Sequence, residues 1–310
     1  MSVRILQGDC RDVLKTLPDE SVHCVVTSPP YWGLRDYGMP GQIGLERKLP
    51  QFVEELLYVF QEVRRVLRND GTVWINIGDC YNAYNGGAGP SSSLSQGAQT
   101  PERPKLETGF GLREKGLKPK DLCLIPERLA LALQEDGWWV RSRVIWAKPN
   151  PMPESVTDRP TKSHEHIWLL AKSERYFYDA DAIKEPSNPE NNRDSGTRRR
   201  EVPPGQRTDT GFDNGRNYVD RNKRDVWTVT VKPFAGAHFA TFPADLIEPC
   251  ILAGCPAGGT VLDPFGGAGT TGLVADRHGR DAILIELNPE YAAMAKRRIQ
   301  GDSPLFADVA

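Results

Sequence analysis

The sequence lacks several features that would place it in common protein classes. It has no run of about 18 consecutive apolar residues, so we expect no transmembrane helix. It starts directly with a strand-like pattern, and we expect no signal peptide. The six cysteines are scattered and form no Cys-x-x-Cys pair, which argues against a zinc site or a disulfide framework. A reducing cytoplasm is therefore the expected compartment.

A strong excess of charge of one sign is also absent. The formal net charge of the 310 residues is −2, so any surface that binds nucleic acid must be locally basic. A hydrophobic content of 39% is enough for a sizeable core. The length suits one large domain or two modest ones.

Strand and helix patterns alternate at both ends of the chain. Residues 22–26 (VHCVV) predict a buried parallel strand. Residues 51–68 have helical apolar spacing, with Pro50 before them and residues 69–71 (NDG) as a stop before a strand at 72–77. Further expected helices are 126–135, 246–253, 270–277 and 291–299, and further expected strands are 138–147, 166–171, 260–262 and 281–286. Pro249 is expected either to bend its helix or to mark its start. This alternation predicts an α/β fold with a mostly parallel, doubly wound sheet.

Two stretches interrupt this rhythm. Residues 81–120 are rich in Gly, Ser and Pro, which predicts a long mobile loop. Residues 185–224 contain almost no apolar side chains, and from Pro186 to Arg224 nine Arg or Lys stand against six Asp or Glu. This second stretch is either a solvated linker or a surface for a charged partner.

A glycine-rich turn, VLDPFGGAGTTG, spans residues 261–272. Gly267, Gly269 and Gly272 fit G-x-G-x-x-G between a strand and a helix, which predicts a ligand site at the carboxyl edge of a sheet. A Walker A loop is excluded, because no Gly-Lys-Ser/Thr follows. A nicotinamide or flavin site and a purely structural turn both remain open.

Asp263 at the tip of the strand favours another cofactor. A dinucleotide site needs glycines near a pyrophosphate but no carboxylate at this position. S-adenosylmethionine instead carries an α-ammonium, a sulfonium and a ribose, and no phosphate. Asp263 suits its methionine end, and Glu286, at the end of the next expected strand, suits the ribose hydroxyls.

A second loop, VVTSPPYWGL, spans residues 25–34. Its two prolines make it rigid and non-helical at the end of a strand. The Ser28 hydroxyl and the Pro29 carbonyl can each accept one hydrogen of an exocyclic amino group, which directs the nitrogen lone pair toward a methyl donor. Tyr31 can stack on the base, which must be flipped out of a duplex to reach the loop. The alternative is a structural Pro-Pro turn against which the tyrosine packs.

Together the two loops resemble the amino-group DNA methyltransferases. TSPPYW is similar to their catalytic motif and DPFGGAGTTG to their cofactor motif, in the circularly permuted order of the beta class. The resemblance implies a Rossmann-like S-adenosylmethionine-dependent methyltransferase fold with an inserted DNA-recognition region. It divides the chain into a catalytic half (1–180), a target-recognition region (181–235) and a cofactor-binding half (236–310) of the same domain.

The resemblance also implies site residues. The catalytic residues would be Ser28, Pro29, Pro30 and Tyr31. The cofactor contacts would be Asp9, Thr241, Phe242, Pro243, Asp263, Phe265, Gly267, Gly269, Thr270, Thr271, Glu286 and Asn288. The DNA-binding residues would be Arg198, Arg199, Arg200, Arg207, Arg216, Arg221, Lys223 and Arg224.

Serine at position 28 resembles the cytosine-N4 members, whereas adenine-N6 members more often have Asp or Asn there. Cytosine N4 is thus the expected target and adenine N6 the alternative. The expected partner is double-stranded DNA, with no membrane; a monomer and a homodimer are both open. The setting would be a bacterial cell or a phage-infected host.

Other interpretations are weaker. An RNA or protein methyltransferase could share the fold, and a DNA-binding module without activity would leave both loops unexplained. The Pro249-Cys250 pair lies in an apolar helix, so Cys250 is interpreted as core rather than as a 5-methylcytosine nucleophile. His164 and His166 have no second cluster to complete a metal site, and no metal is expected.

Overall fold

The computed structural model describes residues 2–82, 116–187, 219–232, 242–302 and 308–309. Most of the expected loop at 81–120 therefore lies outside the described residues, as does most of the segment 185–224. The mobility predicted for 81–120 remains a prediction.

The described strands form a nine-stranded sheet in the order β11-β1-β10-β9-β2-β3-β5-β4-β8. The strands are β1 (Ser2–Gln7), β2 (Val22–Thr27), β3 (Leu67–Ile77), β4 (Trp139–Ala147), β5 (His164–Ala171), β8 (Val226–Thr228), β9 (Thr260–Asp263), β10 (Asp281–Glu286) and β11 (Asp308–Val309). All neighbours are parallel except β3–β5 and β5–β4. The predicted mostly parallel α/β sheet is confirmed.

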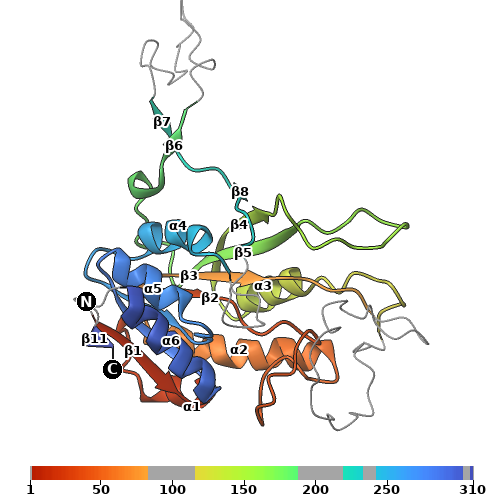
Figure 1. The fold of residues 1–310 in the computed structure, drawn as a ribbon, viewed down its shortest axis with the longest axis horizontal. Helices are drawn as coiled ribbons and strands as arrows, with labels where there is room; N and C mark the ends of the chain where they lie inside the picture. Colours follow the sequence, from red (N-terminus) through yellow and green to blue (C-terminus); the bar gives the residue numbers. More distant parts are fainter. Residues whose placement is uncertain (1, 83–115, 188–218, 233–241, 303–307, 310) are drawn as a thin grey trace, which may run out of the picture.

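Helices cover both faces of the sheet (Figure 1). On one face lie α1 (Cys10–Val13), η1 (Leu14–Thr16), α2 (Leu49–Val66) and α3 (Ile125–Glu135), and on the other α4 (Ala244–Gly254), α5 (Thr270–Arg277) and α6 (Pro289–Asp302). Two apolar clusters fill the two layers, one centred on α2 and one on α4 and α5. Burial of this apolar surface is the main force that holds the doubly wound arrangement together.

The start of α2 agrees with its sequence, but its end differs from the prediction. Pro50 lies in the first turn, where its missing N–H costs nothing. The helix ends at Val66, and the backbone of the next residue, Leu67, is already extended. The predicted stop at residues 69–71 is wrong, since these residues lie inside β3 at an irregularity in its register with β2. Gly71 permits this path: a Cβ there would lie 2.5 Å from Leu67 Cδ1.

Pro249 does not mark the start of its helix. The helix α4 begins at Ala244, directly after Pro243, and Pro249 lies inside it. The helix is largely apolar and buries Leu246, Cys250 and Ile251 completely, so packing outweighs the one hydrogen bond that the proline removes. The interpretation of Cys250 as a core residue is confirmed.

A short ribbon of β6 (Glu185–Pro186) and β7 (Asp220–Arg221) follows the 3-10 turn η2 (Asp181–Ile183) and stands away from the main sheet (Figure 1). It brings together the described ends of the segment 185–224. Within the described part of the chain, no helix is both long and apolar enough to cross a membrane. The proposed division of the chain at 180 and 235 remains a prediction.

The turn before α5 requires glycine at position 269. Gly269 has a φ of 77°, and a Cβ there would lie 2.8 Å from the Ala295 Cβ of α6. We expect Gly269→Ala to lower the free energy of unfolding by on the order of 1–3 kcal/mol, through a strained backbone and a displaced α6. Chemical denaturation measures the effect. Gly301→Ala is the control, because a Cβ at 301 meets nothing within 4 Å; an equal loss in both variants would contradict the packing argument.

Candidate active site at the carboxyl edge of the sheet

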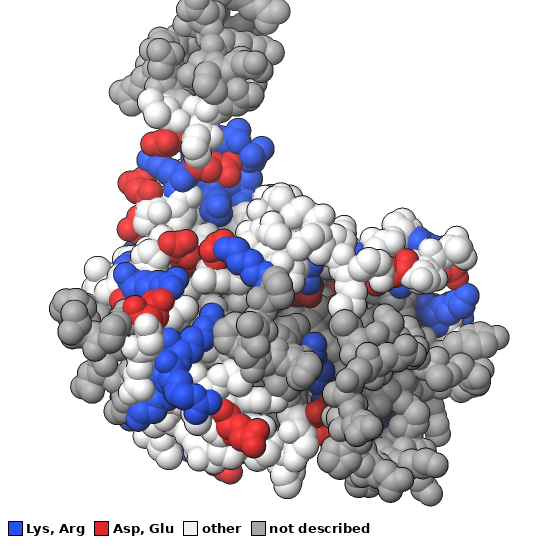
Figure 2. All heavy atoms as spheres, viewed as in Figure 1, with Lys and Arg blue, Asp and Glu red and all other residues white. Residues whose placement is uncertain are grey.

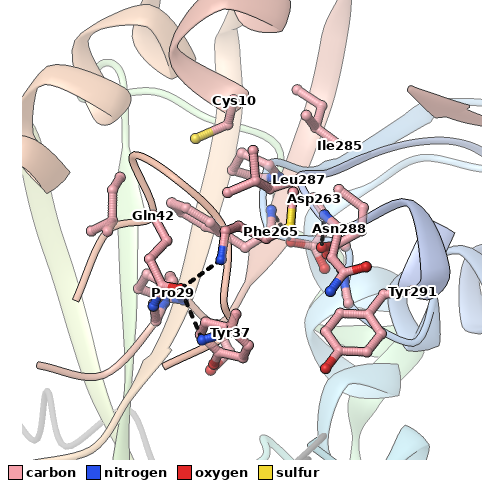
Figure 3. A pocket seen from close by; sticks show the side chains of 18 of the residues that line it. Cys10, Pro29, Tyr37, Gln42, Asp263, Phe265, Ile285, Leu287, Asn288 and Tyr291 are labelled. Atoms are coloured by element: carbon pink, nitrogen blue, oxygen red, sulfur yellow. Dashed lines mark hydrogen bonds between the residues drawn. The ribbon is translucent and has the colours of Figure 1, made fainter. Parts of the chain in front are cut away.

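A pocket opens where β1, β2, β9 and β10 end. It encloses about 1270 Å³ of space outside the atoms, part of it open to solvent. Figure 3 shows side chains from three segments converging on it: the TSPPYW loop after β2 (the catalytic loop, residues 27–32), the turn after β9 (the glycine loop, residues 264–269) and the turn after β10. The predicted site residues that line it are Asp9, Ser28, Pro29, Pro30, Tyr31, Phe242, Asp263, Phe265, Gly267, Thr270, Glu286 and Asn288. The two loops singled out in the sequence thus share one cavity.

Three predicted cofactor contacts do not line this pocket. Thr271 is buried beneath it, Gly269 packs against α6, and Pro243 precedes α4. These three residues pack behind the residues that line the pocket. Thr241 lies outside the described residues.

The buried Asp263 carboxylate links the two loops. Its Oδ1 accepts hydrogen bonds from Thr27 Oγ1 at 2.6 Å and from the Phe265 amide at 3.0 Å, and its Oδ2 accepts one from Thr271 Oγ1 at 2.6 Å. Only 1% of the residue is exposed. Burial raises the pKa of Asp263 to about 6, although the three hydrogen bonds oppose the rise. A cation nearby would favour the ionised form.

Glu286 organises the glycine loop from the end of β10. Its Oε2 accepts a hydrogen bond from the Gly267 amide at 2.7 Å, and its Oε1 accepts one from the Asn288 amide at 2.8 Å. Burial raises the pKa of Glu286. An acidic residue in this position, after the strand that follows a glycine loop, can accept hydrogen bonds from ribose hydroxyls. The pocket suits a ligand that is cationic or offers hydroxyl groups.

The third carboxylate of the pocket, Asp9, is paired with an arginine that the sequence analysis missed. Arg11 binds the Asp9 carboxylate through Nε and Nη2, contacts Glu55 at 2.8 Å and donates to the Gly41 carbonyl at 2.6 Å. Burial by itself would raise the pKa of Asp9, but the hydrogen bonds and charge of Arg11 outweigh it and lower the pKa. Arg11 therefore holds the segment around Gly41 against the pocket.

This segment supplies pocket residues that no sequence motif indicated. Gln42 Oε1 accepts a hydrogen bond from the Tyr37 amide at 2.8 Å (Figure 3), and Gln42 Nε2 donates to the Arg35 carbonyl at 3.2 Å. Burial raises the pKa of Tyr37. Leu287 and Tyr291 close the side nearer α6. The sequence could have indicated residues 34–43 as part of the pocket only because they directly follow the TSPPYW motif.

The catalytic loop presents Ser28 and Tyr31 to the pocket, with Pro29 buried between them. The Tyr31 hydroxyl donates to Glu165 Oε2 at 2.7 Å; Asn76 Oδ1 lies 3.3 Å from it, and the Ser28 side chain also interacts with it. Burial, followed by the negative charge of Glu165, raises the pKa of Tyr31 well above its ordinary value. Tyr31 is therefore a neutral phenol, and the sequence analysis missed its partners on β3 and β5.

The predicted DNA-binding residues are only partly described. Arg221 and Arg224 each donate to Glu185 Oε1, at 2.9 and 2.6 Å, and the Lys223 ammonium lies 5.1 Å from the centroid of a Trp227 ring. Figure 2 shows acidic and basic side chains mixed at the base of the ribbon. The predicted DNA-binding residues outside the described part are Arg198, Arg199, Arg200, Arg207 and Arg216.

The two histidines lie at the start of β5, as a strand assignment requires. Their ring centroids are 5.3 Å apart, and His166 Nδ1 lies 3.7 Å from Glu127 Oε1. Among the described residues, no group of three or more His, Cys, Asp or Glu is arranged to hold a metal ion.

The chain is similar to known proteins in both sequence and structure. Residues 22–297 match the family model described as DNA methylase, of the N6 and N4 type. The Type II methyltransferase M.Cfr9I of Citrobacter freundii is 49% identical over 301 residues, covering 96% of this chain and 88% of the relative. M.SmaI of Serratia marcescens, also a Type II methyltransferase, is 44% identical over 298 residues, covering 96% and 91%.

Two solved structures share the fold. The PvuII DNA methyltransferase (cytosine-N4-specific) superposes with a TM-score of 0.63 at 20% identity, covering 95% of this chain and 85% of that one. A candidate DNA modification methylase of Thermus thermophilus, complexed with S-adenosyl-L-methionine, gives 0.60 at 26% identity, covering 99% of each chain.

These matches confirm the predicted family, its fold and its cofactor, and they make DNA rather than RNA or protein the substrate. Asp263, Glu286 and the apolar walls formed by Phe265 and Leu287 fit the phosphate-free cofactor of that family. The chain therefore belongs to the N6/N4 family of DNA methylases and is a Type II DNA methyltransferase that uses S-adenosyl-L-methionine.

Proposed function

We propose that this enzyme methylates the exocyclic N4 of cytosine in double-stranded DNA. The observation that carries the proposal is Ser28 at the head of the catalytic loop, in the same pocket as Asp263 and Glu286. A serine hydroxyl is a neutral acceptor, whereas an aspartate would place a negative charge beside the reacting nitrogen. Adenine N6 is the alternative. The Type II relatives suggest a role beside a restriction enzyme in the cytoplasm of a bacterial cell.

The chain offers a group for each part of the cofactor. Asp263 would face the methionine ammonium, Glu286 the ribose hydroxyls, and Asp9 the adenine amino group. Phe242 and Phe265 would supply apolar walls. Thr241, Gly267, Thr270 and Asn288 complete the proposed set of cofactor contacts, and Pro243, Gly269 and Thr271 support them from outside the pocket lining. When bound, S-adenosylmethionine supplies an electrophilic methyl group to this site.

The catalytic loop would position the target amino group. Ser28 Oγ and the Pro29 carbonyl accept its two hydrogens, which reduces delocalisation of the nitrogen lone pair into the ring. The two prolines keep these acceptors fixed, so little reorganisation is needed at the moment of reaction. Tyr31 stacks on the flipped base, and each stacked base can contribute about 1–3 kcal/mol. This offsets part of the cost of leaving the duplex.

The segment 185–224 is the proposed target-recognition region. Arginine can read guanine edges and can neutralise phosphates. The mutual pairing of Arg221 and Arg224 with Glu185 gives these two residues a role at the base of the ribbon, which leaves the Arg198-Arg199-Arg200 triplet as the stronger candidate for contact with DNA.

The methylated product tests the base. Unmethylated plasmid is incubated with labelled cofactor and digested to nucleosides for mass spectrometry. N4-methylcytosine is the expected product, and N6-methyladenine would show that Ser28 does not choose the base.

Ser28→Ala combined with Tyr31→Ala should abolish methylation while cofactor binding is retained, because neither residue belongs to the cofactor set. A double variant that keeps its activity would contradict the proposed roles of these two side chains in holding the target base.

The pKa of Asp263 makes cofactor binding dependent on pH. In the free protein this carboxyl has a pKa of about 6, and the cofactor ammonium would favour its ionised form. Affinity should therefore weaken as the pH falls through 6, and binding at pH 6 should release about half a proton. Calorimetry in buffers of different ionisation enthalpy measures the release. Asp263→Asn should abolish it and weaken binding at neutral pH, whereas substitution of the exposed Asp245 by Asn should leave both unchanged.

Substitution of Arg198, Arg199 and Arg200 by Ala tests the recognition region. If the three contact phosphates, the slope of log affinity against log salt should fall by up to about 0.9 per contact. Binding to plasmid fragments across a salt series measures the slope. Arg277→Ala, on α5, is the control. An unchanged affinity and slope in the triple variant would remove the triplet from the interface.

A further inference from the structure

The Tyr31 hydroxyl is anchored in polar groups beneath the catalytic loop. It donates to Glu165 on β5 at 2.7 Å and lies 3.3 Å from the Asn76 amide oxygen on β3. These two strands are antiparallel neighbours, with Asn76 opposite Ile167, so both partners come from rigid elements. The hydroxyl is therefore held by two side chains of the sheet, in addition to its interaction with Ser28 in its own loop.

The two partners are themselves held in place. Asn76 Nδ2 donates to Glu165 Oε2 and to the His166 carbonyl, both at 3.2 Å, which orients its oxygen toward Tyr31. The Lys148 ammonium, just after β4, forms a close ion pair with Glu165 Oε1 and lies 4.2 Å from the centroid of a Trp146 ring. Only 13% of the Glu165 side chain and 18% of the Lys148 side chain are exposed.

The ring of Tyr31 is constrained as well. It lies directly over Gly78, where a Cβ would be 2.7 Å from Tyr31 Cε2 and 3.2 Å from Cδ2. The hydroxyl is held at one end by Glu165, and one side of the ring is held by the backbone at Gly78. The ring therefore has a single orientation toward the pocket that Ser28 also lines.

A largely buried ion pair is an expensive way to stabilise a fold. Removing two charges from water costs several kcal/mol per ion, and well-packed apolar side chains often serve as well or better. A fully satisfied polar network instead specifies one geometry. Here the geometry specified is that of the aromatic ring that would stack on the target base.

We propose that Glu165, supported by Lys148 and Asn76, is a positioning residue for methyl transfer: it holds the Tyr31 ring in the orientation that stacks on the flipped base. The proposal rests on the stacking role proposed for Tyr31. Glu165 acts through the Tyr31 hydroxyl and does not touch the reacting atoms. A phenylalanine ring at position 31 would stack but would lose this anchor.

A double-mutant cycle with Glu165→Gln and Tyr31→Phe tests the proposal. Single-turnover methylation of unmethylated plasmid by saturating labelled cofactor is measured for each variant, and calorimetry gives the cofactor dissociation constant. Each single variant should slow methylation on the order of 10- to 100-fold, the size of one charge-assisted hydrogen bond. The double variant should be no slower than the slower single variant, because the charge of Glu165 has no contact left to strengthen once the Tyr31 hydroxyl is gone. Cofactor affinity should not change.

Three results would overturn the proposal: a wild-type rate in Tyr31→Phe, a wild-type rate in Glu165→Gln, or losses that multiply in the double variant. Because Tyr31→Phe removes a single oxygen atom, it remains informative even if Glu165→Gln folds poorly. Glu62→Gln is the matched control, since Glu62 is a partly buried carboxylate paired with Arg65 at 3.0 Å on α2. Its rate should equal that of the wild type.

The double-mutant cycle tests the role of Glu165 independently of the assignment of cytosine as the target base. The cycle uses only rates, whereas the target base is identified from the methylated nucleoside of the wild-type reaction. If that nucleoside is N6-methyladenine, the cytosine assignment fails and the non-additivity still decides the role of Glu165. If N4-methylcytosine forms while the losses multiply, the positioning role alone fails.

Discussion

The buried carboxylate of Asp263 is the interaction on which the rest of the site depends. It accepts hydrogen bonds from Thr27 at the end of β2, from Thr271 at the start of α5, and from the amide of Phe265 in the glycine loop. A buried carboxylate without partners would be strongly destabilising, so these donors are required wherever Asp263 lies. Because they come from both loops, satisfying one charge fixes the catalytic loop relative to the cofactor loop.

The pairing of strands in the sheet brings Thr27 and Asp263 together although they lie far apart in the sequence. β2 and β9 pair in parallel, with Val25 opposite Leu262, although 236 residues separate Thr27 from Asp263. Their carboxyl ends meet at the same edge, where ligands of open α/β sheets bind. β1 extends this edge from the other end of the chain by pairing with β10. A catalytic motif near the N-terminus and a cofactor motif near the C-terminus therefore form one pocket.

The sequence predicted what local patterns determine. Apolar periodicity located α2 and α3 and most of the strands of the main sheet. The glycine and proline spacings located both loops of the site. It missed the partners that are distant along the chain: Glu165 lies 134 residues from Tyr31, and no local pattern links them. Pro249 and the residues at 69–71 were interpreted by local propensity, which packing in α4 and β3 overrides.

Proline and tertiary contact fix different parts of the catalytic loop. The prolines restrict the backbone and so set where the Ser28 hydroxyl and the Pro29 carbonyl lie. They do not restrict the torsions of the Tyr31 side chain, which a short loop cannot hold by itself. Asn76, Glu165 and Gly78 supply that constraint from the sheet. Misplacement of a reacting group by about 1 Å can cost about 100-fold in rate. A loop whose backbone was rigid but whose ring was free would hold the amino group and still leave a stacked base poorly aligned. With the stacking role proposed for Tyr31, the ion pair beneath the ring therefore contributes to catalysis as well as to packing.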